Sequence, residues 1–168
     1  MAVVACRWPR KSPVNNLFSY FYQRKSNCTV SKTLVILTCS QKKGLKPAAA
    51  RDLYQGSLFK LGRKFAEVQH FDYMIISAKY GLLLPEQVIS PYDQRISNMS
   101  DVRRIRETVL PQLREILPLY EKIIMIGGSY YRKVLEPIKS AKFEIITDSR
   151  GIGGILQQLK RRIASIEE

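Results

Sequence analysis

The sequence predicts an α/β protein, a three-layer domain in which four parallel strands have helices on both faces. Short apolar runs alternate with longer segments in which apolar residues recur every three or four positions. The first pattern is typical of buried strands, and the second is typical of amphipathic helices. Strands separated by helices are joined by crossovers, which favour a parallel sheet covered on both faces.

The elements alternate regularly from Thr33 onward. The expected strands are TLVILT (33–38), DYMIIS (72–77), EKIIMIG (121–127) and KFEIIT (142–147). The expected helices are residues 54–69, 99–117, 129–139 and 153–166, each with an apolar stripe. This order brings all four strand ends to one edge of the sheet, where folds of this class bind ligands.

Residues 1–32 are predicted to be a basic N-terminal extension of an α/β domain that spans residues 33–168. The extension holds six of the 28 Lys and Arg residues and none of the 14 Asp and Glu residues. Its composition is similar to that of an organelle transit peptide. A tail, or a start codon assigned too early, fits the same composition, and the aromatic residues at 18–22 would also suit packing on the domain.

The net charge of +14 favours an anionic partner such as RNA, DNA or a nucleotide. The alternative is that the charge serves solubility alone. Three cysteines without a secretory segment indicate a reducing, cytoplasmic environment. The one histidine, His70, has no zinc-like spacing with cysteine, so no metal or other cofactor is expected. No apolar run has the length of a membrane span, so no membrane partner is expected, and the oligomeric state is left open.

Each expected strand ends in small, hydroxyl-bearing or charged residues. They are Cys39, Ser40 and Lys43 for the first strand, Ser77, Lys79 and Tyr80 for the second, Gly127, Gly128 and Ser129 for the third, and Asp148, Arg150 and Gly151 for the fourth. Loops are polar in most proteins. Four such ends at one sheet edge nevertheless predict a single site.

The connection from Ala78 to Asn98 is long for a loop between a strand and a helix. Loops of this length are usually functional or disordered. An apolar run and two prolines within it indicate order. We expect a lid that returns Tyr92 and Asp93 to the site.

Cys39 is the candidate nucleophile. Lys42 and Lys43 follow it closely, and the next strand end adds Lys79, so nearby positive charge would favour its thiolate. The alternative is a small buried cysteine with lysines that only bind phosphate. Backbone N–H groups of the Gly127-Gly128-Ser129 segment, and of the glycines at 151–154, would also suit an anion.

Several of these motifs resemble a small, largely uncharacterised domain family of microbes and phages. The resemblance covers residues 33–166, and its most specific part is Ser-Ala-Lys-Tyr-Gly-Leu at 77–82. The other matching motifs are Cys-Ser-x-x-Lys at 39–43, Asp-Leu-Tyr at 52–54, Pro-Tyr-Asp at 91–93 and Arg-Gly-Ile-Gly at 150–153.

Two more distant resemblances concern chemistry. Cys-Ser-x-x-Lys is similar to a motif of the archaeosine synthase core domain, which modifies a 7-deazaguanine base in tRNA. That motif continues with Pro-Tyr and a later histidine, whereas Gly44 and Leu45 follow here and no later motif supplies the histidine. A weaker similarity is to the peroxide-stress protein YaaA.

Two classes of function follow. The first is an enzyme that processes a nucleobase or nucleotide, within RNA or DNA or free, by base modification or by base transfer or removal. Cys39, Asp93 and Lys79 would carry the chemistry, and Lys43 and Arg150 would hold phosphate. The second is a non-catalytic nucleic-acid-binding module that uses the basic extension and exposed helix cations.

Overall fold

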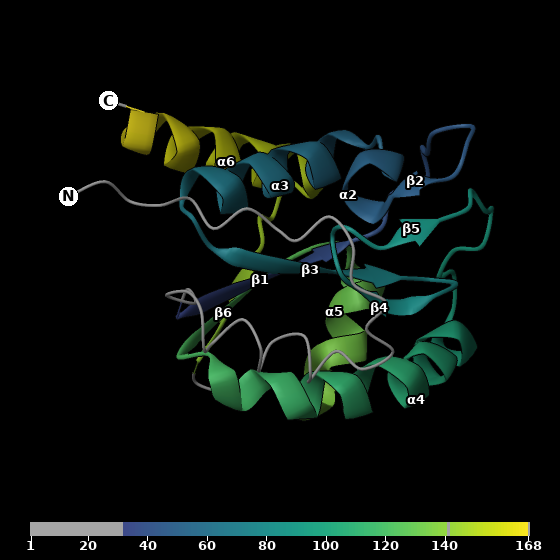
Figure 1. Ribbon diagram of the computed structural model, residues 1–168. Coiled ribbons are helices and arrows are strands. Elements are labelled where there is room, and N and C mark those ends of the chain that lie inside the picture. The colour runs from purple at the N-terminus through teal and green to yellow at the C-terminus, as the bar shows by residue number, and fades with distance from the viewer. Residues whose placement is uncertain (1–31, 141, 168) are drawn as a thin grey trace.

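A five-stranded sheet forms the middle of three layers in the computed structural model, which describes residues 32–140 and 142–167. The strands run in the order β4 (Gly81–Leu83), β3 (Asp72–Ser77), β1 (Thr33–Thr38), β6 (Lys122–Ile126) and β7 (Phe143–Ile146). One face is covered by α3 (Ser57–Val68) and α6 (Ile152–Glu167), and the other by α4 (Met99–Ile116) and α5 (Ser129–Leu135) (Figure 1). None of the helices in the described part is long and apolar enough to cross a membrane.

The mixed α/β class and the mostly parallel sheet are confirmed, but the predicted count of four strands is wrong by one. The four predicted strands β1, β3, β6 and β7 pair in parallel. The fifth, β4, pairs antiparallel with β3. A tight turn after Ser77 ends at Gly81, whose φ of 75° suits glycine, and the apolar residues that follow return along β3.

Alternate residues of the central strands pack in two different hydrophobic cores, one on each face of the sheet. Residues Leu34 and Ile36 pack with Ile105 and Leu113 in the core beneath α4 and α5. Residues Val35 and Leu37 and their neighbours pack in a second core beneath α3 and α6. Because both faces of each central strand are buried, the strands are continuous apolar runs.

Short elements order the long connection between β3 and α4. Its strand β5 (Val88–Ile89) pairs with β2 (Ala48–Ala49), which leads into the single-turn helix α2 (Ala50–Leu53). The backbone N–H groups of α2 donate to carbonyls of residues 85 and 87 at 3.0 and 2.9 Å. The connection is therefore held against the segment that follows β1. Two 3₁₀ turns, η1 (Leu117–Leu119) and η2 (Glu136–Ile138), complete the described elements.

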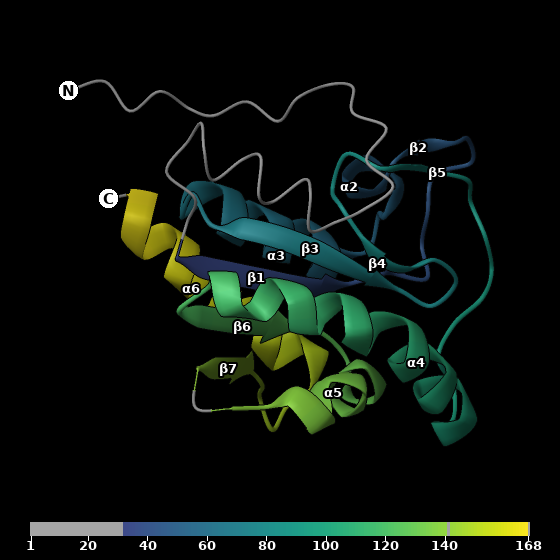
Figure 2. The same cartoon turned by 60° about the horizontal axis from the view of Figure 1, so that its bottom comes forward.

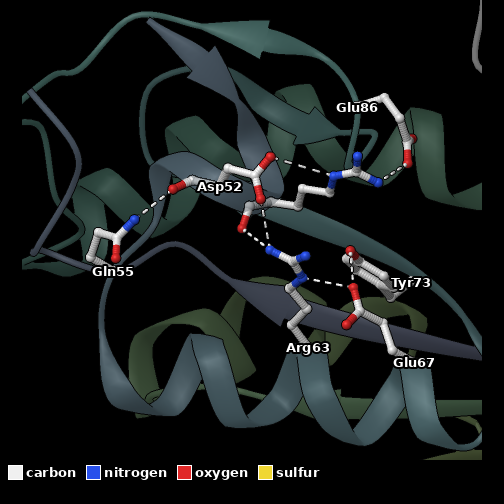
Figure 3. Close-up of polar contacts among 7 residues, drawn as sticks. Asp52, Gln55, Arg63, Glu67, Tyr73 and Glu86 are labelled. Atoms are coloured by element: carbon white, nitrogen blue, oxygen red, sulfur yellow. Dashed lines mark hydrogen bonds and ion pairs between the residues drawn. The ribbon is translucent and has the colours of Figure 1, made fainter. Parts of the chain in front are cut away.

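A network of charged side chains reinforces this attachment (Figure 3). Arg63 on α3 donates to Asp52 at 2.9 Å and to Glu67 at 2.7 Å. Arg51 reaches Glu86 of the connection at 3.3 Å. A single exposed ion pair contributes little to stability. These ion pairs matter because together they join α2, α3 and the connection into one network.

The chain order of the sheet creates a switch point between β1 and β6. The crossover through α3 places β3 on one side of β1, and the crossover through α4 places β6 on the other side. At the carboxyl ends of β1 and β6 the chains approach closely, since a Cβ on Gly127 would lie 2.8 Å from Thr38 Oγ1. Ligands bind at such switch points in this fold class.

Candidate active site

Cys39 is the first residue beyond β1 and lies at the switch point. Its backbone N–H still donates to Ile76 O of β3 at 2.9 Å, and its side chain is half-buried between the two cores. The Cys39 sulfur lies 2.9 Å from the Tyr131 hydroxyl on α5. Burial raises the pKa of Tyr131, with Cys39 as the next cause, so this phenol keeps its proton at neutral pH and can donate it to the sulfur.

Ser77 fixes the end of β3 and the position of Tyr92. The Ser77 Oγ accepts hydrogen bonds from the N–H groups of Lys79 at 3.2 Å and Tyr80 at 3.0 Å. These bonds occupy both lone pairs, so the Ser77 hydroxyl donates its proton to Tyr92 Oη, 2.8 Å away. Tyr92 Oη is in turn 2.8 Å from Tyr54 Oη. Hydrogen bonds between these hydroxyls thereby hold Tyr92, a residue of the long connection, beside the strand ends.

We call Tyr54, Tyr80, Tyr92 and Tyr131 the tyrosine cluster. The rings of Tyr80 and Tyr92 meet edge to face with centroids 5.4 Å apart, and those of Tyr54 and Tyr92 do so at 6.4 Å. Burial raises the pKa of Tyr54 to about 12. Burial, followed by the neighbouring Cys39, also raises the pKa of Tyr92. The phenols of Tyr54 and Tyr92 therefore act as neutral hydrogen-bonding groups at neutral pH.

Two lysines lie over the tyrosine cluster. Lys43 Nζ is 4.2 Å from the centroid of the Tyr92 ring, and Lys79 Nζ is 5.2 Å from the Tyr80 ring and 6.0 Å from the Tyr92 ring. Within the described ranges neither ammonium is in an ion pair with a carboxylate. Both charges are thus available to an anionic ligand.

Other predicted residues of the first and third strand ends have structural contacts or open surroundings. Ser40 Oγ donates to Lys42 O at 2.7 Å and accepts from Gly56 N at 3.0 Å, so its hydroxyl holds the loop together. A Cβ on Gly128 would meet no atom within 4 Å, and Ser129 is exposed at the start of α5. The surroundings of Gly128 and Ser129 are therefore open.

Asp93 follows Tyr92 but its side chain is exposed. In the part of the chain that the structure describes, no hydrogen bond or ion pair holds its carboxylate. Its catalytic role stays a prediction.

Asp148, Arg150 and Gly151 form a separate group before α6. Asp148 Oδ1 accepts from the backbone N and the Nε of Arg150, both at 2.9 Å, and Gln158 donates to Oδ2 at 3.0 Å. The bonds from Arg150 lower the pKa of Asp148 well below its usual range. Gly151, with φ 73°, ends this turn. These contacts tie the fourth strand end to α6 and not to the tyrosine cluster.

Sequence reasoning did not select Tyr54 and Tyr131 for the site. Tyr54 was expected to begin a helix, but it is buried in an extended stretch between α2 and α3. Tyr131 is half-buried within α5, where an aromatic residue is ordinarily part of the core. Two signals were available: Tyr54 ends the Asp-Leu-Tyr motif, and Tyr131 follows just after the third strand. As for metals, the described residues contain no group of three His, Cys, Asp or Glu side chains placed as ligands.

A family model described as a family of unknown function, DUF6884, matches residues 34–161. The chain belongs to the DUF6884 family. The matched range covers every candidate site residue from Cys39 to Gly151 and leaves residues 1–33 outside.

Two other proteins are similar to this DUF6884 chain over most of its length. The uncharacterised protein YfjM of Bacillus subtilis (strain 168) is 27% identical over 148 residues, which cover 82% of this chain and 99% of YfjM. The crystal structure of AF0587, a protein of unknown function, aligns with a TM-score of 0.45 and 17% identity over 89% of this chain. The alignment covers 50% of AF0587, so this chain spans about half the length of that protein.

The expected membership of an uncharacterised family is confirmed by the DUF6884 match and by YfjM. The more distant similarities to the archaeosine synthase core and to YaaA stay predictions. The predicted extension at residues 1–32 falls almost entirely outside the described residues and likewise stays a prediction.

Proposed function

We propose that this DUF6884 protein is an enzyme that processes a nucleobase or nucleotide, free or within RNA or DNA, with Cys39 as its nucleophile. One observation carries the proposal. The Cys39 sulfur lies at the switch point of the sheet, 2.9 Å from a phenol that stays protonated, and two lysines lie over the adjoining tyrosine rings. A sulfur that receives a hydrogen bond from one phenol, close to two lysines without ion-pair partners, suits attack on an anionic substrate.

Each neighbour has a role in this proposal. The Tyr131 hydroxyl stabilises the anionic sulfur by donating a hydrogen bond. Lys43 and Lys79 bind a phosphate group or the negative charge that develops in the reaction. The half-exposed ring of Tyr80 offers a face on which a base can stack. Asp93, exposed beside Tyr92, is the alternative catalytic group.

The reaction class that fits best is base modification, or transfer or removal of a base. In base transfer or removal, the Cys39 sulfur would displace the base from the sugar carbon as the glycosidic bond breaks, and water or an incoming base would then displace the sulfur. We assign Asp148 no step in this reaction, because its carboxylate is bound by Arg150 and Gln158.

The alternative is a non-catalytic nucleic-acid-binding module, and the exposed cations Arg103, Lys160 and Arg161 favour it. Other helix cations suit it less, because Arg104 and Arg106 donate to backbone carbonyls and Arg162 pairs with Glu144 at 2.7 Å. We prefer the enzyme, because a module that binds through surface cations would not need the hydrogen-bonded hydroxyls of Ser77, Tyr92 and Tyr54.

Protection of Cys39 from alkylation tests the enzyme proposal. Iodoacetamide labelling is followed by mass spectrometry with and without a mixture of nucleotides and short RNA. We expect nucleotide to slow the labelling of Cys39, and Lys79→Gln to abolish this protection. Lys160→Gln, an exposed lysine of α6, is the control that should retain it. Labelling of Cys39 at one rate in all mixtures would contradict the proposal.

A further inference from the structure

A hollow lies on the α4–α5 face of the sheet, between α5 and the edge strand β7. Its volume is about 570 Å³, within the range of ligand pockets. It is lined by Ser129, Arg132, Lys133, Glu136, Lys139, Phe143, Ile145 and Thr147. Figure 2 shows α5 beside β7 at this end of the sheet. None of the residues proposed to react lines it.

Two periodicities build this hollow. Ser129, Arg132, Lys133 and Glu136 recur at helical spacing, so they form one stripe of α5 and its extension. Phe143 and Ile145 alternate along β7, so they share one face of the strand, and Thr147 directly follows the strand end. The result is a pocket with polar cationic side chains on the helix and an apolar floor on the strand.

The side chains that line the hollow carry a net positive charge. Its one acid, Glu136, is 3.3 Å from Arg106 of α4 and is therefore already paired. The half-buried Arg132 and the exposed Lys139 have no acidic partner among residues 32–140 and 142–167. A hollow lined by a guanidinium, an unpaired ammonium and an aromatic ring suits a phosphate attached to a planar base.

We propose that this hollow binds a phosphate-bearing nucleotide unit, with the phosphate on Arg132 and Lys139 and the base against Phe143. The inference rests on the proposed function. Helix α5 links the two sites, because Tyr131 contacts Cys39 while the adjacent Arg132 lines the hollow. A strand of RNA or DNA with one nucleotide at Cys39 would place a flanking nucleotide here. A free nucleotide is the other source of the same chemistry.

The experiment compares two double variants with equal loss of charge. Arg132→Gln with Lys139→Gln removes the cations of the hollow, and Lys160→Gln with Arg161→Gln removes two exposed cations of α6. Binding of AMP, and of a short fluorescent single-stranded RNA, is measured by titration at fixed salt. We expect the first variant to weaken binding at least about tenfold and the second less than about threefold. Equal weakening by both variants, or no effect of the first, would overturn the inference.

The substitution Phe143→Leu tests separately whether the base of the nucleotide stacks on the Phe143 ring. It removes the ring but keeps an apolar floor, so AMP should bind several-fold more weakly while inorganic phosphate is unaffected. Unchanged AMP binding would overturn the stacking role of Phe143. If RNA binds more tightly than AMP, the natural ligand is a nucleic-acid strand. If AMP binds more tightly than RNA, the natural ligand is a free nucleotide.

Failure of this inference is distinct from failure of the proposed function. Cys39 labelling in the first double variant gives the second readout. If nucleotide still protects Cys39 while the variant binds RNA normally, the hollow is not a nucleotide site and the function stands. If binding falls tenfold in the double variant while no nucleotide protects Cys39 even in the wild-type protein, the hollow is a nucleotide site and the proposed function is wrong.

Discussion

Ser77 is the buried residue on which the arrangement of the candidate site depends. Its hydroxyl satisfies two backbone N–H groups and positions Tyr92. In Ser77→Ala these three groups lose a partner in a buried place, so we expect the free energy of unfolding to fall by about 1–3 kcal/mol. Urea unfolding measures this, and Ser149→Ala, at an exposed position, is the control. A loss as small as that of the control would mean that Ser77 does not hold Tyr92.

The buried phenols predict an unusual alkaline titration. Burial raises the pKa values of Tyr54, Tyr73, Tyr92 and Tyr131, and that of Tyr54 to about 12. A folded pKa above the unfolded value of about 10 leaves stability intact below pH ~10 and reduces it as the pH rises toward 12. Phenolate absorbance should therefore show at least four of the nine tyrosines ionising only as the protein unfolds.

The same titration in denaturant supplies the reference, because all tyrosines of an unfolded chain ionise together. A native titration that matches it below the unfolding pH would show that the tyrosine cluster is solvated.

Single residues also show what sequence reasoning could find. Cys39, Ser77 and Tyr92 could be selected because they follow or end predicted strands or return in a Pro-Tyr-Asp motif. The pairing of Asp148 with Arg150 could not, since it depends on a turn geometry set by Gly151. Tyr54 was missed because its burial depends on contacts with residues far along the chain, such as Tyr92.

Among the elements, buried strands were predicted best. The limits of β1 and β3 match the predicted runs because both faces of these strands are apolar. Helix α3 begins three residues later than expected, after Gly56 in an extended conformation. Strand β4 was mistaken for loop, because three apolar residues carry too little pattern to separate a short antiparallel strand from a lid.

Helix α4 begins at a side-chain cap that can be tested. Asn98 Oδ1 accepts a hydrogen bond from the N–H of Asp101 at 2.9 Å. Asn98→Ala should reduce the free energy of unfolding by about 1 kcal/mol, measured by thermal or urea unfolding. Ser100→Ala, in the exposed first turn, is the matched control and should change it by less than half as much. Equal effects of the two substitutions would contradict the cap.

For the whole molecule, the topology of the sheet explains why the candidate site residues lie close together, whereas the amino-acid composition does not. The predicted alternation of strands and helices required parallel strands with their ends at one edge, and the end of β1 meets the end of β3 and the start of α5 around Cys39. The order of strands could not be predicted from the pattern, and this order decides that β7 lies at the far edge. The fourth strand end is therefore separated from the tyrosine cluster.

The central claim is that Cys39 reacts with a nucleobase or nucleotide. The most direct measurement is mass-spectrometric profiling of free nucleotides and of the nucleosides of RNA and DNA in cells that express the protein, compared with cells that express Cys39→Ala. Ser149→Ala is the control for substitution at an exposed site. We predict that at least one nucleoside or nucleotide changes in abundance with the wild-type and Ser149→Ala proteins and not with Cys39→Ala. A profile that is the same for all three proteins, or a change that persists with Cys39→Ala, would contradict the account.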